Sequence, residues 1–260
     1  MLNEVTYPII FGHRGASAYA PENTLAAFEL ALRQEADAIE LDAKLSRDGH
    51  VVTFHDQTLD RTTEGSGPLR KKSLAELRKL DAGSHFDVAF SGEPIPTLDE
   101  VFKAVGKLTY INVELTNYAS PFDNLPHKVA ELVKKHKLSR RILFSSFSWI
   151  TLYRIHRLLP DIPLGLLAES GWRGWRSRSW LGRVLPYQSL NPEAKDVTPD
   201  LVNNAHQRGK RVFVYTVNTE TEMRRLFELG VDGIFTDDPV LARNVRQTVL
   251  RKEKNGNITR

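Results

Sequence analysis

The run Ile9-Ile10-Phe11-Gly12-His13-Arg14-Gly15 (residues 9–15) is typical of a buried strand that ends at a glycine and leads into a loop carrying a histidine and an arginine. Two later stretches have the same form. Residues 39–42, Ile-Glu-Leu-Asp, end a second apolar run with two carboxylates, and residues 51–56, Val-Val-Thr-Phe-His-Asp, end a third with another histidine. Binding of a phosphate-sized anion, binding of a divalent cation and proton transfer would use these residue types together.

Strand and helix patterns alternate from this first run to the C-terminus. Asn23 is expected to cap the first helix, because Leu25, Phe28 and Leu32 then recur at helical spacing. Eight parallel strands are predicted, at residues 9–12, 38–42, 110–114, 142–145, 163–167, 185–190, 211–217 and 233–236, and later helices at 98–105, 125–137, 148–158, 199–207 and 220–229. Eight βα repeats close a TIM barrel, an α/β fold with its active site at the C-terminal strand ends. An open doubly wound sheet is the weaker alternative, because no G-x-G-x-x-G follows the first strand.

The second and third apolar runs are too close together for a helix between them, and Asp48-Gly49 lies between two alternating segments. This pattern predicts a β-hairpin. If Asp48 and Gly49 are the two turn residues, Asp42 lies directly opposite His55, with Cβ atoms about 5 Å apart. Residues 57–95 are predicted to form a small insertion after the second strand. The whole chain, 1–260, is expected to be one barrel domain with a flexible tail at 250–260.

The composition is that of a globular chain with a sizeable core. Hydrophobic residues make up 41% of the 260 residues and charged residues 26%, while 36 Lys and Arg against 32 Asp and Glu leave a net charge of +4. This modest excess does not indicate nucleic-acid binding. The absence of cysteine excludes disulfides, thiolate nucleophiles and Cys-ligated zinc. No secretory signal and no apolar run of about 18 residues is present, so a cytoplasmic location is expected. The oligomeric state is left open.

Three carboxylates are the candidate metal ligands. Glu40 and Asp42 are two residues apart on one strand and so point to the same face, and Glu114 can join them from the next strand. Three oxygen ligands without cysteine suit one divalent cation, Mg²⁺ or Ca²⁺. The alternative is that these acids are only salt-bridged to Arg14 and nearby lysines. A cation is favoured, because clustered acids in a barrel mouth are costly without one.

His13 and His55 are the candidate acid and base, because only these two of the eight histidines follow a buried run beside the acids. The other six fall in helical segments, in the turn or in the insertion: His50, His85, His127, His136, His156 and His206. Arg14 is always charged and can hold two phosphate oxygens in its planar fork. A salt bridge from Arg14 to Glu40 or Glu114 is compatible with that role.

Several short motifs occur in order between about residues 9 and 244, and any one of them alone would be weak. They are His13-Arg14-Gly15, Pro21-Glu22-Asn23-Thr24, Glu40-Leu41-Asp42, Asp48-Gly49, His55-Asp56, Asn112-Val113-Glu114, Thr216-Val217-Asn218 and Gly233-Ile234-Phe235-Thr236-Asp237-Asp238-Pro239. Together they resemble the glycerophosphodiester phosphodiesterases, above all the bacterial cytosolic type. The resemblance implies a TIM barrel with an insertion after the second strand, a divalent cation at the three acids and catalytic roles for the two histidines.

Two positions depart from the family pattern. The family often carries a lysine two residues after its third acid, where this chain has Thr116, so phosphate neutralisation is expected to rest on Arg14 and the cation. The family's frequent tryptophan before Thr-Val-Asn is Tyr215 here. The resemblance implies that this aromatic ring packs against the glycerol side of the substrate.

The function that follows is metal-dependent hydrolysis of a small glycerophosphodiester to glycerol 3-phosphate and an alcohol. The nucleophile is either water or the substrate's own glycerol hydroxyl. Alternatives on the same barrel are a phospholipase C or sphingomyelinase D relative, or a phospholipase D directed at lyso-phospholipids. A third alternative is an anion-binding module that has lost catalysis, which Thr116 would favour.

The segment 171–183 is unusually rich in Trp and Arg and follows a predicted strand on the catalytic side of the barrel. Trp favours the lipid headgroup zone and Arg favours anionic surfaces, so contact with a membrane or a lyso-phospholipid is one hypothesis. A lid packed on its own barrel is the favoured alternative.

Overall fold

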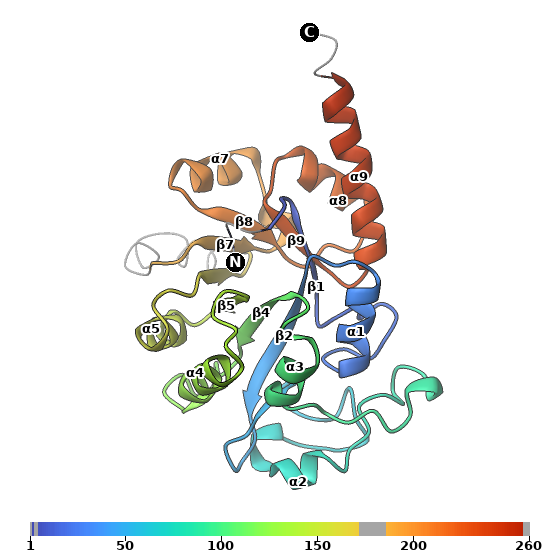
Figure 1. Cartoon of the computed structure of the whole chain (residues 1–260), viewed down its shortest axis with the longest axis vertical. Helices are drawn as coiled ribbons and strands as arrows, with labels where there is room; N and C mark the ends of the chain where they lie inside the picture. The colour runs from blue at the N-terminus through green and yellow to red at the C-terminus, as the bar shows by residue number, and fades with distance from the viewer. Residues whose placement is uncertain (1, 3–4, 172–185, 257–260) are drawn as a thin grey trace.

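The computed structural model describes residues 2, 5–171 and 186–256, and over these residues the chain forms a closed parallel barrel surrounded by helices (Figure 1). The sheet order is β1-β9-β8-β7-β6-β5-β4-β2-β3, and pairing of β1 with β2 closes the ring of eight parallel strands. The strands are β1 (Ile9–Gly12), β2 (Ala38–Leu45), β3 (Val51–Thr53), β4 (Tyr110–Leu115), β5 (Ile142–Ser146), β6 (Leu164–Ala168), β7 (Ser189–Pro192), β8 (Arg211–Val214) and β9 (Gly233–Thr236). The predicted TIM barrel is therefore confirmed.

Five of the barrel helices begin at a Ser or Thr cap whose side chain accepts a backbone N–H of the first turn, which satisfies a donor that would otherwise have no partner. The helices are α1 (Leu25–Arg33), α3 (Leu98–Val105), α4 (Leu125–His136), α5 (Trp149–Leu158), α7 (Pro199–Gln207), α8 (Glu220–Glu228) and α9 (Pro239–Gly256). The prediction that Asn23 caps α1 is wrong, because Thr24 is the cap and accepts from the Ala27 N–H. Asn23 has a φ of 59° and turns its side chain to Asp42 instead.

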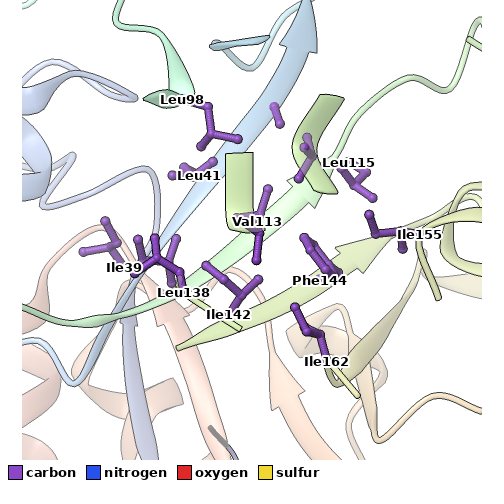
Figure 2. Close-up of a cluster of buried hydrophobic side chains, with 14 of the residues drawn as sticks. Ile39, Leu41, Leu98, Val113, Leu115, Leu138, Ile142, Phe144, Ile155 and Ile162 are labelled. Atoms are coloured by element: carbon purple, nitrogen blue, oxygen red, sulfur yellow. The ribbon is translucent and has the colours of Figure 1, made fainter. Parts of the chain in front are cut away.

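Apolar side chains fill two layers. Inside the barrel, Phe11 stacks on Phe235 with ring centroids 4.5 Å apart and meets Phe213 edge-on at 5.2 Å. Outside it, side chains of β2, β4 and β5 pack against the surrounding helices, as Figure 2 shows for Ile39, Leu41, Val113 and Phe144 beside Leu98 and Ile155. Neighbouring side chains of a strand face these two layers alternately. The residues that remain at the mouth of the barrel are polar.

The β2–β3 hairpin differs from the prediction by one residue. Ala43 pairs with Thr53 and Leu45 with Val51, and the Gly49 N–H donates to the Ser46 carbonyl at a φ of 82°. The turn thus has three residues rather than two, with glycine in the left-handed position that such turns favour. Asp42 consequently faces Phe54, whose N–H donates to the Asp42 carbonyl, and the predicted pairing of Asp42 with His55 is wrong.

The stretch between β3 and α3 contains η1 (Leu69–Lys71), α2 (Leu74–Leu77) and η2 (Val88–Phe90), and its apolar residues form a separate cluster with Val52 and Phe54. In Figure 1 it extends below the barrel beyond β2. At the other end of the chain, α9 continues to Gly256, so residues 250–256, expected to be a flexible tail, are helical.

Strand β7 and the Trp- and Arg-rich segment lie in the same part of the chain. The strand predicted at 185–190 is β7 at 189–192, because Ser189 and Asn191 point into the barrel, where their side chains bond to each other at 2.9 Å. Polar residues at these positions interrupt the apolar run by which a buried strand is recognised in a sequence, so the predicted strand was displaced. The Trp- and Arg-rich segment lies outside the described residues except at Gly171. Across the part of the chain that the structure describes, no helix combines the length and apolar character of a membrane span.

Candidate active site

Three carboxylates converge at the mouth of the barrel. Glu40 and Asp42 lie on β2 and pair with Asn112 and Glu114 of β4, and one oxygen of each of the three acids lies within 4.8 Å of the others. Burial, together with Asp42 and Glu114, raises the pKa of Glu40 well above its usual range, and burial and Asp42 raise the pKa of Glu114 to about 8. Burial opposes ionisation of Asp42 too, but the charges of Arg14, His55 and Lys44 and the hydrogen bond from Asn23 together outweigh it and lower the pKa of that carboxyl.

This donor set fits a divalent cation such as Mg²⁺ or Ca²⁺. Beside the ionised Asp42, Glu40 and Glu114 keep their protons unless a cation replaces them, as their raised pKa values show. The buried Oδ1 of Asn112 also lacks a hydrogen-bond partner among the described residues, which leaves one more oxygen beside the cluster. Hard oxygen donors of this kind are the ligands that Mg²⁺ and Ca²⁺ prefer.

Residues of the Pro21–Thr24 motif hold the arginine and one acid in place. The Arg14 N–H donates to Glu40 Oε2 at 2.9 Å, and its Nη1 donates to Glu22 Oε1 at 2.9 Å. Asn23 exchanges two hydrogen bonds with Asp42, one through its Nδ2 at 2.9 Å and one from the Asp42 N–H at 3.1 Å. A guanidinium held in this way cannot swing out of the site, so it is preorganised for an anion.

The first histidine is oriented by an acid from the far end of the chain. His13 Nδ1 lies 2.7 Å from Asp237 Oδ1, and the same carboxylate accepts hydrogen bonds from Ser17 and Asn218. Burial of Asp237 opposes its ionisation, but these hydrogen bonds outweigh it and lower its pKa. Because Nδ1 is held by a carboxylate, Nε2 of His13 is the nitrogen left for proton transfer.

The second histidine is held by its sequence neighbour. His55 Nδ1 lies 2.6 Å from Asp56 Oδ1, and Arg61 Nε donates to Asp56 Oδ2 at 2.7 Å. Burial is the largest single influence on Asp56 and raises its pKa, but the hydrogen bonds and charges of Arg61 and His55 together outweigh it and lower the pKa to about 2. Arg61 also donates to both Glu22 oxygens at 2.7 Å, so one chain of ion pairs links His55 to Arg14.

One pocket of about 230 Å³ collects most of the predicted site residues. Its lining includes His13, Arg14, Glu40, His55, Glu114 and Tyr215, and Asp42 completes the acid cluster beside it. Phe147, Leu167 and Tyr215 form an apolar wall, with the Tyr215 hydroxyl donating to the Ala168 carbonyl at 3.0 Å. The pocket therefore combines acids, two imidazoles and one guanidinium with a surface suited to carbon atoms.

Sequence reasoning missed a lysine. Lys44 follows Asp42 by two residues on β2, and its Nζ donates to Thr116 Oγ1 at 2.9 Å. Its ammonium therefore lies beside Thr116, the residue position just after β4 at which the family pattern expects a lysine. The i, i+2 spacing from Asp42, which places Lys44 on the same strand face, was the signal that could have found it. Asp237, Asp56, Glu22 and Arg61 were missed as partners of site residues.

Comparisons with known proteins agree with this geometry. The model of the glycerophosphoryl diester phosphodiesterase family matches residues 13–241. The chain is 37% identical over 233 residues to a glycerophosphodiester phosphodiesterase of Caldanaerobacter subterraneus subsp. tengcongensis, covering 89% of this chain and 94% of that protein. It is 34% identical over 250 residues to one from Bacillus subtilis, covering 90% and 85% of the two chains.

A solved structure gives the same result. The chain superposes on an Oleispira antarctica phosphodiesterase in complex with the product sn-glycerol-3-phosphate, with a TM-score of 0.84 and 33% identity over 92% of this chain and 96% of that chain. The chain is therefore an enzyme of the glycerophosphoryl diester phosphodiesterase family.

Proposed function

We propose that this enzyme hydrolyses glycerophosphodiesters to sn-glycerol 3-phosphate and an alcohol, with one divalent cation, Mg²⁺ or Ca²⁺, held by Glu40, Asp42 and Glu114. When bound, the cation would stabilise negative charge on the phosphoryl oxygens. The observation that carries the proposal is the pairing of two histidines, each with Nδ1 on its own carboxylate, around one buried acid cluster. The product bound in the Oleispira antarctica relative supports the choice of substrate.

In this proposal, His13 and His55 share the proton transfers. One imidazole takes the proton of the nucleophile and the other gives a proton to the oxygen of the leaving alcohol, and the carboxylate behind each ring stabilises its charged form. Arg14 balances the charge of the phosphoryl group from a position fixed by Glu22 and Glu40. Tyr215 contributes to the apolar wall against the glycerol carbons.

The test is release of glycerol 3-phosphate from glycerophosphocholine, with and without a chelator. We expect the activity to vanish with chelator and to return with Mg²⁺ or Ca²⁺. His13→Ala and His55→Ala should each lower kcat by about 10²-fold or more while the protein remains folded. His127→Ala on the exposed side of α4 is the matched control and should leave kcat unchanged.

Three outcomes would contradict the proposal. Hydrolysis that resists the chelator would contradict the role of the cation. A near-normal kcat in either histidine variant would contradict the role of that histidine in proton transfer. In a wider substrate profile, release of inositol phosphate from an inositol phospholipid or of a ceramide product from sphingomyelin, with no glycerol 3-phosphate from glycerophosphocholine, would instead assign the enzyme to a phospholipase class.

A further inference from the structure

A second pocket of about 360 Å³ lies beside the catalytic one. It is formed by the β2 end of the hairpin, the start of the segment after β3, and the loop between β4 and α4. The side chains used below are Lys44, Arg47, Gln57, Arg70, Thr116 and Asp123. It is a separate compartment at the mouth of the barrel, because the three acids, Arg14 and the two histidines do not line it, and Lys44 is the residue of the active site that it shares.

Three chain segments carry residues from one pocket into the other. Glu114 of β4 lines the catalytic pocket, and Thr116, just after the end of β4, lines the second. After β3, His55 lines the first and Gln57 the second. On β2, the acids are followed by Lys44, which interacts electrostatically with both Asp42 and Glu114. The acid cluster is therefore the boundary between the two pockets, and a diester whose phosphoryl group is held there has one pocket for each of its two alcohols.

The charges of the second pocket are mainly positive. Lys44, Arg47 and Arg70 face a single acid, Asp123, which accepts hydrogen bonds from Asn117 Nδ2 at 2.8 Å and from the Leu125 N–H at 3.0 Å. Arg47 is already engaged, with Nη2 3.0 Å from Glu76 Oε2. The Arg70 side chain is exposed and has no hydrogen-bond or ion-pair partner among the described residues. Since Lys44 Nζ already donates to Thr116 Oγ1, Arg70 is the one cation of this pocket without a partner among the described residues.

We propose that this second pocket receives the alcohol half of the diester, and that it selects alcohols that carry a second anionic group, a phosphate or a carboxylate. The inference rests on the proposed function, because the acid cluster must hold the phosphoryl group for the two pockets to share one substrate. The apolar wall of the catalytic pocket suits the glycerol carbons, which leaves the cationic pocket to the leaving group. A cationic alcohol such as choline gains nothing from Arg70.

The experiment compares kcat/KM for glycerophosphocholine and for glycerophosphoinositol 4-phosphate. The wild type should prefer the second substrate. Arg70→Ala should lower kcat/KM for glycerophosphoinositol 4-phosphate by about three- to tenfold, since one exposed charge contact to the ligand is lost. The same variant should leave glycerophosphocholine hydrolysis unchanged. The preference should also weaken with added salt, because Arg70 is exposed.

The matched control is Arg140→Ala, an exposed arginine without a partner among the described residues, located before β5 at the opposite end of the barrel. It should change neither value. Equal effects of Arg70→Ala on both substrates, or no effect on either, would overturn the subsite while leaving the proposed function standing. A wild-type enzyme that hydrolyses neither diester would overturn the proposed function and the subsite with it.

Discussion

Replacement of Asp237 by Asn tests whether His13 depends on its carboxylate partner. Oδ1 of Asp237 accepts from His13 Nδ1 and from Ser17, and Oδ2 accepts from Asn218 Nδ2. An amide offers only one oxygen, so its NH₂ group must face one of these donors. Asn218 cannot turn to accommodate it, because its Oδ1 already accepts from the residue 237 N–H at 2.9 Å.

Either orientation of the new amide is unfavourable. If the NH₂ group faces Asn218, two donors meet at an exposed position, and the lost hydrogen bond costs about 0.5–1.5 kcal/mol of folding free energy. If it faces His13, Nδ1 must accept, which puts the ring proton on the reacting Nε2. With the NH₂ group facing His13, the enzyme loses most of the rate enhancement that one general acid or base contributes. We expect kcat to fall by about 10²- to 10⁴-fold, equivalent to about 3–5 kcal/mol of activation free energy.

The assay is glycerol 3-phosphate release under saturating substrate, with denaturant unfolding of the same samples. Asp232→Asn is the matched control, because Asp232 also binds a histidine, with His206 Nε2 2.7 Å from its Oδ2, but precedes β9 at the opposite end of the barrel. The control should lose stability and keep kcat within about twofold of wild type. Equal losses of kcat in both variants, or a kcat near wild type in Asp237→Asn, would refute the reasoning.

Three further predictions concern packing, charge and acid stability. Gly15→Ala should lower the free energy of unfolding in urea by about 2–5 kcal/mol, because its φ is 90° and a Cβ would lie 2.5 Å from the Ala27 carbonyl carbon; a smaller loss would mean that the backbone relaxes. Lys44→Thr should lower kcat by about tenfold or more, and the double variant Lys44→Thr/Thr116→Lys should regain much of the lost kcat. If the double variant does not regain it, a lysine after β4 cannot replace the lysine of β2. The folded pKa of Asp56, about 2 against 3.8 for the free side chain, makes a stabilising contribution that is present above about pH 4 and lost toward pH 2. Solvent screening reduces this contribution to about 1 kcal/mol. On acidification, the free energy of unfolding in urea should therefore fall by about 1 kcal/mol more for the wild type than for Asp56→Asn. Identical pH profiles of the two proteins would contradict the pairing of Asp56 with Arg61.

The barrel and the acid cluster could be predicted from local sequence because they depend on short periodicities. A strand is recognised from four or five residues, and two acids at i and i+2 on one strand share a face wherever that strand lies. Glu40 and Asp42 therefore came together in the prediction without any knowledge of the tertiary structure. His13 and Glu114 could be predicted to lie near these two acids, because the C-terminal ends of all the parallel strands of a barrel meet at the same mouth.

The hairpin register and the helix cap were mispredicted because each depends on competition between local options. Asp48-Gly49 fits a two-residue turn, but the structure uses Gly49 as the left-handed residue of a three-residue turn. Asn23 is as good a cap as Thr24 in isolation. Its amide instead binds Asp42, a contact that exists only once β2 is in place beside it.

By itself, the sequence determined the strand periodicity, the order of the motifs and the residues that occupy the strand ends. Only the tertiary structure decided which partner each of them has. Asp237 is 224 residues from His13 and reaches it because β1 pairs with β9 to close the barrel. Lys44 reaches Thr116 because β2 pairs with β4 in this register. Such pairs depend on strand register and barrel closure, which are properties of the whole packed sheet and of no local segment.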